Sequence, residues 1–139
     1  MDQITTNKPI QDLRQWLDLV ALGTVCDVVP LTGLNRAFVR RGLDVMRRRG
    51  NVGLATLADV AGVDRSPDTY LAGFVLGPRI NAGGRVGQAD LGHRLLTSGD
   101  AAAALPLARA LDQYNSERKA IEQAVTEAAL QEAEKAVDC

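Results

Sequence analysis

Residues 100–137 read DAAAALPLARALDQYNSERKAIEQAVTEAALQEAEKAV, a stretch dominated by residues of high helix propensity. Asp100 is a suitable residue to cap a first helical turn. Pro106 either kinks this helix or delays its start by one turn. Apolar side chains follow one helical stripe, formed by Leu107, Leu111, Tyr114, Ile121, Val125 and Ala128. The stretch therefore predicts a long helix in a mainly α chain.

The rest of the chain predicts shorter helices, at residues 12–22, 35–49, 53–61, 66–76 and 89–97. Two segments depart from the helical pattern. Residues 25–31, VCDVVPL, are apolar and mostly β-branched, which favours a short buried strand or extended segment. Gly77–Arg85 contains three glycines and a proline, which predicts a loop.

Charge is distributed unevenly, although the formal net charge is only −1. Residues 36–49 carry six arginines against one aspartate, and residues 112–138 carry seven acids against three bases. The basic segment indicates either a nucleic-acid-binding face or an ordinary solvated helix face.

The two cysteines, Cys26 and Cys139, offer no disulfide framework and are expected to be reduced thiols. The sequence contains no apolar run of about 18 residues and no signal-peptide pattern. We therefore expect a cytoplasmic protein that does not associate with membranes.

Asp27 is the most unusual candidate for chemistry, because a carboxylate within an apolar run is costly to bury unless it is paired or bound to a metal. The alternative from spacing alone is a structural role, in which Asp27 caps a turn or pairs with an arginine. Arg79, Asn81 and Arg85 lie in the glycine-rich segment, where guanidinium groups and backbone amides could bind phosphate. An ordinary connection between helices is the alternative. His93 has no second ligand at metal-binding spacing.

Three segments together resemble RecJ-type members of the DHH phosphoesterase superfamily. Residues 19–31, followed by Asn35 and Arg36, are similar to the last motif of the family's catalytic domain. Gly77–Arg85 resembles the family signature Gly-Pro-Arg-Ile-Asn-Ala-Ala-Gly-Arg, with Gly83 in place of the second alanine. The third match consists of Leu111, Asp112, Asn115, Arg118, Ile121 and Glu122.

The resemblance implies a division of the chain. Residues 1–10 would be a tag or linker remnant, and residues 11–34 the C-terminal edge of an α/β DHH catalytic domain. Residues 35–50 would be the connecting helix, and residues 51–139 the helical part of the second core domain.

The resemblance further implies a 5′-to-3′ exonuclease that hydrolyses single-stranded DNA with Mn²⁺ or Mg²⁺ by two-metal chemistry. Asp27 would be a catalytic metal ligand, and Arg79, Asn81 and Arg85 would bind DNA phosphate. The family's D-H-D and D-H-H motifs do not occur in this sequence. We therefore expect an interior fragment that is inactive alone, binds no metal tightly and self-associates through faces exposed by excision.

Two alternatives remain open on the sequence alone. One is another DHH-superfamily phosphodiesterase, such as an oligoribonuclease. The other is a non-catalytic helical module that binds nucleic acid.

Overall fold

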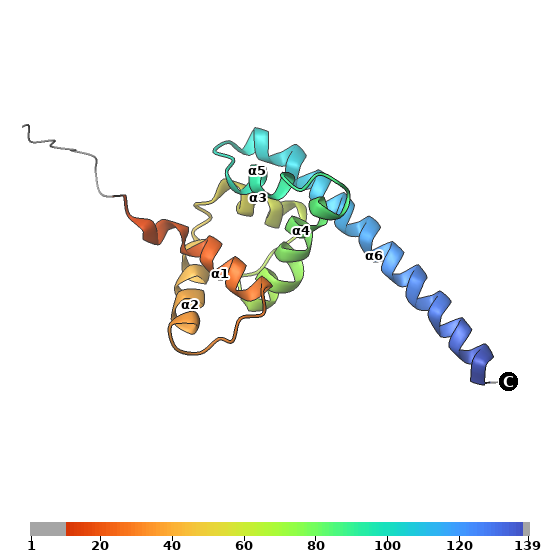
Figure 1. Cartoon of the computed structure of the whole chain (residues 1–139). Coiled ribbons are helices and arrows are strands. Elements are labelled where there is room, and N and C mark those ends of the chain that lie inside the picture. Colours follow the sequence, from red (N-terminus) through yellow and green to blue (C-terminus); the bar gives the residue numbers. More distant parts are fainter. Residues whose placement is uncertain (1–10, 138–139) are drawn as a thin grey trace, which may run out of the picture.

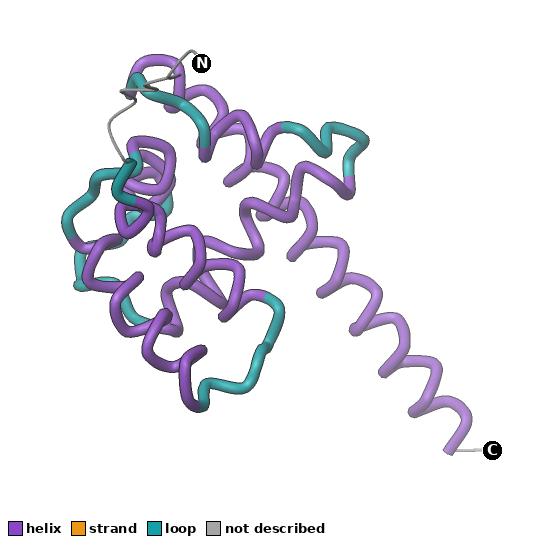
Figure 2. Tube along the Cα trace, turned by 60° about the vertical axis from the view of Figure 1, so that its left-hand side comes forward, coloured by secondary structure: helices purple, strands orange, loops and turns teal. Residues whose placement is uncertain are grey.

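Every regular element in residues 11–137, the part of the chain that the computed structural model describes, is a helix (Figure 1 and Figure 2). This confirms the prediction of a mainly α chain. The elements are η1 (Leu13–Trp16), α1 (Leu17–Cys26), α2 (Gly33–Arg47), α3 (Val52–Val60), η2 (Leu71–Leu76), α4 (Gly77–Arg85), α5 (Leu91–Leu96) and α6 (Ala101–Val137). The expected tag or linker at residues 1–10 and the C-terminal Cys139 lie outside the described residues. None of the described helices has the length and apolar character needed to cross a bilayer.

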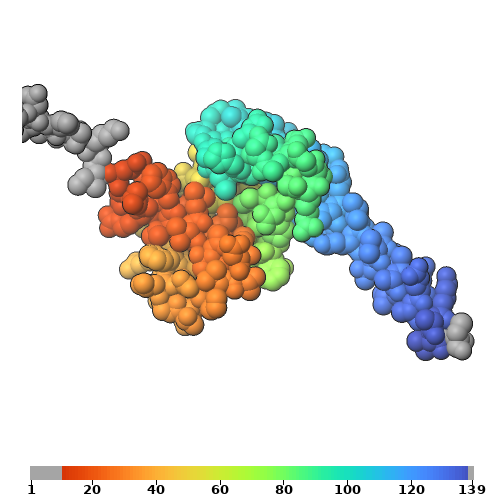
Figure 3. Space-filling view, viewed as in Figure 1, coloured from red at the N-terminus to blue at the C-terminus, as the bar shows by residue number. Residues whose placement is uncertain are grey.

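The long helix α6 begins at Ala101, where the Asp100 carboxylate accepts hydrogen bonds from the backbone N–H groups of Ala102 and Ala103. Pro106 lies inside the helix, so the predicted later start is wrong. Only the first half of α6 belongs to the body of the molecule, where Ala104, Ala108, Leu111 and Asn115 are buried. The second half projects away from that body (Figure 1 and Figure 3). Its stripe residues Ile121 and Val125 are exposed.

The hydrophobic core forms where the first half of α6 packs against α3, α4 and α5. Burying a leucine side chain contributes about 1.5–3 kcal/mol, so a few such residues dominate the stability of this small body. The fully buried leucines are Leu57, Leu71, Leu76, Leu95 and Leu111.

Helices α1 and α2 form a second packed layer beside this core. Gly42 of α2 faces the backbone carbonyl of Leu17 and the side chain of Ala21, with no room for a Cβ atom between them. The missing side chain lets the two backbones approach closely, which holds α1 against α2.

The predicted strand at residues 25–31 is wrong, because α1 continues to Cys26 and the chain then turns. The N–H of Val29 bonds to the carbonyl of Thr24 at 3.1 Å, and that of Val28 bonds to Val25 at 3.1 Å. These paired bonds form a Schellman C-cap, which requires a left-handed residue after the cap. Val28 takes that conformation with φ 56°, although β-branched residues rarely adopt it.

The predicted loop at Gly77–Arg85 is also wrong, because this segment is helix α4 and continues directly from η2. The N–H of Gly77 bonds to the carbonyl of Ala72, a wide π-helical turn placed just before Pro78, which has no N–H to donate. Gly77 and Gly83 are buried where a Cβ atom would collide with neighbouring elements. Tertiary packing therefore overrides the low helix propensity of these glycines.

Candidate functional site

A polar hollow of about 230 Å³ lies where the end of α1 meets η2, α4 and α6; we call it the polar pocket. The pocket brings together residues that are distant in sequence. Its lining consists of Cys26, Gly73, Gly77, Pro78, Asn81, Arg85 and Arg118. Two guanidinium groups and a carboxamide around a small hollow are donors suited to phosphate oxygens.

The helical form of α4 separates the three residues that the sequence grouped together. Asn81 and Arg85 are four residues apart, so they share the helix face that lines the polar pocket. Arg79 precedes Asn81 by two residues, which turns its side chain about 200° around the helix axis. Its Nε donates to Asp112 Oδ1 at 2.7 Å and its Nη1 donates to the Val75 carbonyl at 2.8 Å. Arg79 therefore joins α4 to α6 and does not line the pocket.

Arg118 is a site residue that reasoning from composition and spacing missed. It reaches the polar pocket from α6, and its guanidinium is held on the same helix by two neighbours. The buried Asn115 accepts from Nη2 at 3.2 Å, and Glu122 accepts from Nη1 at 2.5 Å. The signal that could have identified Arg118 was its place in the third segment of the family resemblance.

Cys26 forms the pocket wall contributed by α1. Its Sγ lies 3.6 Å from the Ala72 carbonyl and packs directly against Gly77. Burial, together with the negative charge of Asp27, raises the pKa of the Cys26 thiol. A thiol in this environment stays protonated at neutral pH, so Cys26 is a packing residue of the wall and not a nucleophile.

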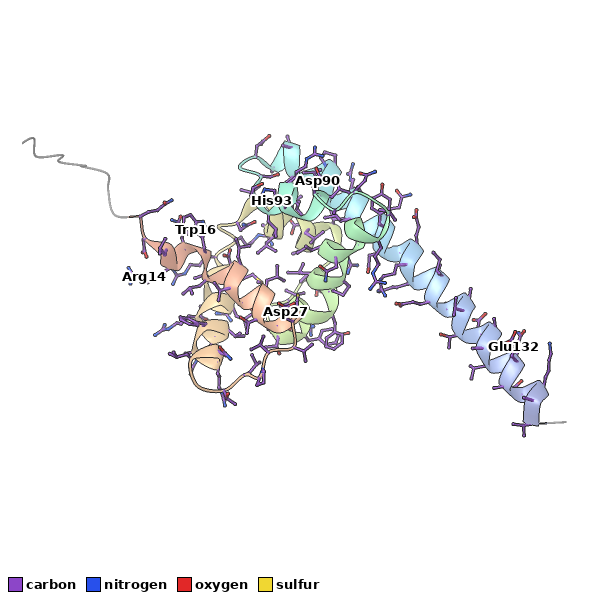
Figure 4. The ribbon with its side chains drawn as sticks, in the orientation of Figure 1. Arg14, Trp16, Asp27, Asp90, His93 and Glu132 are labelled. Atoms are coloured by element: carbon purple, nitrogen blue, oxygen red, sulfur yellow. The ribbon has the colours of Figure 1, made fainter. Side chains whose placement is uncertain are left out.

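Asp27 lies at the C-terminal end of α1, next in the chain to the pocket wall (Figure 4). Its backbone N–H bonds to the Gly23 carbonyl at 3.0 Å. The expectation that this carboxylate is buried within an apolar run is wrong, because Asp27 is exposed. Its carboxylate is thus open to groups that approach from outside the described residues.

The described residues do not fit a divalent metal site by themselves. Within residues 11–137, no three His, Cys, Asp or Glu side chains come together at a distance that could hold a metal ion. Asp27 is a lone carboxylate, and His93 and Asp90 lie on and beside α5, away from it (Figure 4). A metal at Asp27 would need further ligands from other chain segments.

Comparison with known proteins identifies a consistent set of relatives, although no family model matches the chain. The single-stranded-DNA-specific exonuclease RecJ of Bacillus subtilis is 40% identical over 116 residues, which cover 83% of this chain and 15% of the relative. The RecJ protein of Escherichia coli is 42% identical over 133 residues, which cover 93% of this chain and 23% of the relative. The chain thus spans less than a quarter of these curated relatives.

Solved structures agree with the sequence relatives. The structure of Thermus thermophilus RecJ in complex with Mn²⁺ matches with a TM-score of 0.80 and 37% identity. The match covers 87% of this chain and 18% of that one. The Mg²⁺ complex of Thermus thermophilus RecJ matches with a TM-score of 0.76 and 38% identity. The helical arrangement described above is therefore also the arrangement found in a segment of RecJ.

Proposed function

Because this chain belongs to the family of RecJ single-stranded-DNA-specific exonucleases and corresponds to one segment of those proteins, we propose that it is part of a 5′-to-3′ exonuclease. The observation that supports the proposal is the polar pocket, because its donors Asn81, Arg85 and Arg118 suit phosphate and its wall residue Cys26 directly precedes the exposed Asp27. Repair or recombination of DNA in the cytoplasm is the process in which such an enzyme would act.

In this proposal each part of the segment has its own role. Residues 11–34 form the edge of the catalytic domain, residues 35–50 the connection, and residues 51–139 the helical part of the second core domain. Asp27 supplies one carboxylate to a Mn²⁺ or Mg²⁺ centre whose other ligands come from outside the described residues. The metal would activate water and stabilise charge on the scissile phosphate when bound.

Asn81 and Arg85 bind phosphate oxygens of the DNA strand in the polar pocket, and Arg118 acts with them. Arg118 is already oriented by Asn115 and Glu122, so little side-chain freedom is lost when phosphate binds. Arg85 has no ion-pair partner among the described residues, which leaves its full charge for a ligand. Arg79 would reach DNA only by giving up its bond to Asp112. It therefore supports DNA binding indirectly, by holding α4 against α6.

The relatives do not favour the alternative functions. The matching proteins named above are all RecJ exonucleases, and neither an oligoribonuclease nor a non-catalytic module is among them. A substrate series separates the three functions. Preference for 5′-phosphorylated single-stranded DNA supports the exonuclease, preference for short RNA supports the oligoribonuclease, and binding without cleavage supports the module.

The decisive experiment changes Asp27 to Ala in the longer protein that carries this sequence together with the D-H-D and D-H-H motifs. We expect release of mononucleotides to fall by at least about a hundredfold with the melting temperature unchanged, because an exposed carboxylate contributes little to folding. Asp64→Ala, at another exposed aspartate, is the matched control and should retain activity. Normal activity of Asp27→Ala at saturating Mn²⁺ would refute the assignment.

The isolated chain provides a complementary test. With Mn²⁺ or Mg²⁺ it should release no mononucleotides, because residues 11–137 bring no three possible metal ligands together. Exposed apolar residues such as Ile121, Val125 and Leu130 should also make it self-associate, which sedimentation at several concentrations would reveal.

A further inference from the structure

Trp16, the sole tryptophan of the chain, lies with 41% of its surface exposed beside an arginine-rich face of α2. It lines a broad hollow of about 800 Å³ between η1, the start of α1 and the second half of α2. Arg41 and Arg48 also line this hollow. Trp16 lies at the N-terminal end of α1 and Asp27 at the other end (Figure 4), and the hollow shares no lining residue with the polar pocket.

Two arginines that line the hollow, one in α2 and one that caps its C-terminal end, are available for a ligand. Arg41 and Arg48 are exposed, and within residues 11–137 neither has an ion-pair partner. Three aspartates line the hollow. Asp44 pairs with Arg47 at 2.8 Å and Asp12 with Arg14 at 2.8 Å, while Asp18 is only 1% exposed and accepts the Leu19 N–H. The hollow is therefore bordered by two exposed guanidinium groups, those of Arg41 and Arg48, that form no ion pair within the described residues.

The positive surface continues along α2 beyond the hollow. An adjoining depression of about 500 Å³ shares Arg41 and Asp44 with it and adds Arg36 and Arg40. These two arginines are also exposed and have no ion pair in the described part of the chain. Along the helix, positions 36, 40, 41 and 48 lie on one broad solvent-facing side.

We propose that this surface, which we call the Trp16 surface, binds single-stranded nucleic acid. The indole of Trp16 stacks on an unpaired base, while the guanidinium groups of α2 contact successive phosphates. Charge alone would attract any polyanion, but an exposed aromatic ring beside the charge favours a strand whose base faces are free. The Trp16 surface is separate from the polar pocket, so this proposal stands or falls independently of the proposed function.

The fluorescence of Trp16 tests the proposal directly in this chain, because no other tryptophan contributes to the signal. Addition of oligothymidylate of about ten nucleotides, within the usual site sizes of single-strand binders, should quench the emission saturably. Binding should weaken as salt rises. The double variant Arg41→Gln/Arg48→Gln should bind at least about tenfold more weakly, and its salt slope should be smaller by about 1.4, because two phosphate contacts are lost.

Arg109→Gln is the matched control, since Arg109 is an exposed arginine on α6 and has no ion pair in the described region. It removes the same charge from another element and should leave affinity and slope unchanged within a factor of two. A labelled oligonucleotide extends the test to variants that lack the indole. By its anisotropy, Trp16→Phe should bind nearly as well as the unchanged chain, and Trp16→Ala about tenfold more weakly.

Three outcomes would overturn the proposal. One is that Trp16 emission does not change when oligothymidylate is added, whether or not the oligonucleotide binds elsewhere on the chain. Another is equal quenching by heparin or duplex DNA, which would show that the surface binds polyanions in general. The third is an equal loss of affinity in Arg109→Gln, which would show that overall charge and not this surface controls binding.

Discussion

Arg79 Nε donates a 2.7 Å hydrogen bond to Asp112 Oδ1, and this ion pair joins α4 to α6 across 33 residues of chain. Both side chains are largely shielded from solvent, with 14% and 32% of their surface exposed. Hydrogen bonds between charged groups in such positions contribute about 1.5–3 kcal/mol. The pair therefore makes Arg79 a structural link, whereas Arg85 on the other face of α4 is free to bind a ligand.

Arg79→Ala should consequently lower the free energy of unfolding by about 1.5–3 kcal/mol and leave the salt slope of single-strand binding unchanged. Thermal melting and binding over a salt series measure the two effects. Arg47→Ala, which removes the exposed pair with Asp44, is the control and should cost less than about 1 kcal/mol. A lower salt slope in Arg79→Ala with unchanged melting would instead place Arg79 on the DNA.

Arg85→Ala should show the opposite pattern. In the longer protein we expect catalytic efficiency to fall about ten- to a hundredfold, since one phosphate contact is worth about 1.5–3 kcal/mol. The salt slope should fall by about 0.7 and the melting temperature should stay the same. Reduced melting with an unchanged slope would show that Arg85 only stabilises the end of α4.

Gly77→Ala should destabilise the fold, although alanine in a helix is normally better than glycine by about 0.5–1 kcal/mol. The added Cβ atom would overlap Cys26 Sγ, and it would approach the Ala72 carbonyl at 3.0 Å. Gly84→Ala in the same helix meets nothing within 4 Å and should raise the melting temperature. Adding Cys26→Ala should restore much of the stability lost in Gly77→Ala; failure to do so would place the strain elsewhere.

Val28→Gly should stabilise the chain by about 1 kcal/mol, because a side-chain-bearing residue in the left-handed region costs about 1–2 kcal/mol. Val28 has φ 56° and is 85% exposed, so little burial is lost on removing its side chain. Chemical denaturation gives the difference in unfolding free energy. Val137→Gly, at an exposed valine with no such strain at the end of α6, should not be stabilising.

Asp18→Asn should stabilise the chain at neutral pH. Asp18 is 1% exposed, and burial raises the pKa of its carboxyl despite the hydrogen bond that it accepts from the Leu19 N–H. The folded state therefore holds the proton more tightly than the unfolded chain, whose pKa is about 3.9. Stability is lost as pH rises through the unfolded and then the folded pKa, and Asn does not titrate.

The difference in melting temperature between Asp18→Asn and the unchanged chain should thus be positive at pH 7 and vanish below the pKa of the unfolded state. Asn retains an oxygen that can accept the Leu19 N–H, so the local bond is preserved. Asp64→Asn, in an exposed loop, should change melting little at either pH. A constant difference at all pH values would mean that packing, and not ionisation, distinguishes the two proteins.

Local sequence was sufficient to predict the helical class and the longest element. Asp100 caps α6, and the alanines and leucines after it favour a helix at almost every position, so no distant contact had to be known. Asp68, which accepts the Leu71 N–H at 2.7 Å, likewise marks the start of the helix predicted at residues 66–76. Such signals act within a few residues, which is why they can be recognised without a structure.

Tertiary structure decided the form of Gly77–Arg85 and, with it, the composition of the candidate site. The glycines that suggested a loop are needed where Cys26 packs against Gly77 and where Leu91 and Leu111 pack against Gly83. A loop could have turned Arg79, Asn81 and Arg85 to one side, but a helix turns Arg79 toward Asp112 and brings Arg118 to the other two. Propensity is a property of neighbouring residues, whereas these contacts join segments that only the folded chain brings together.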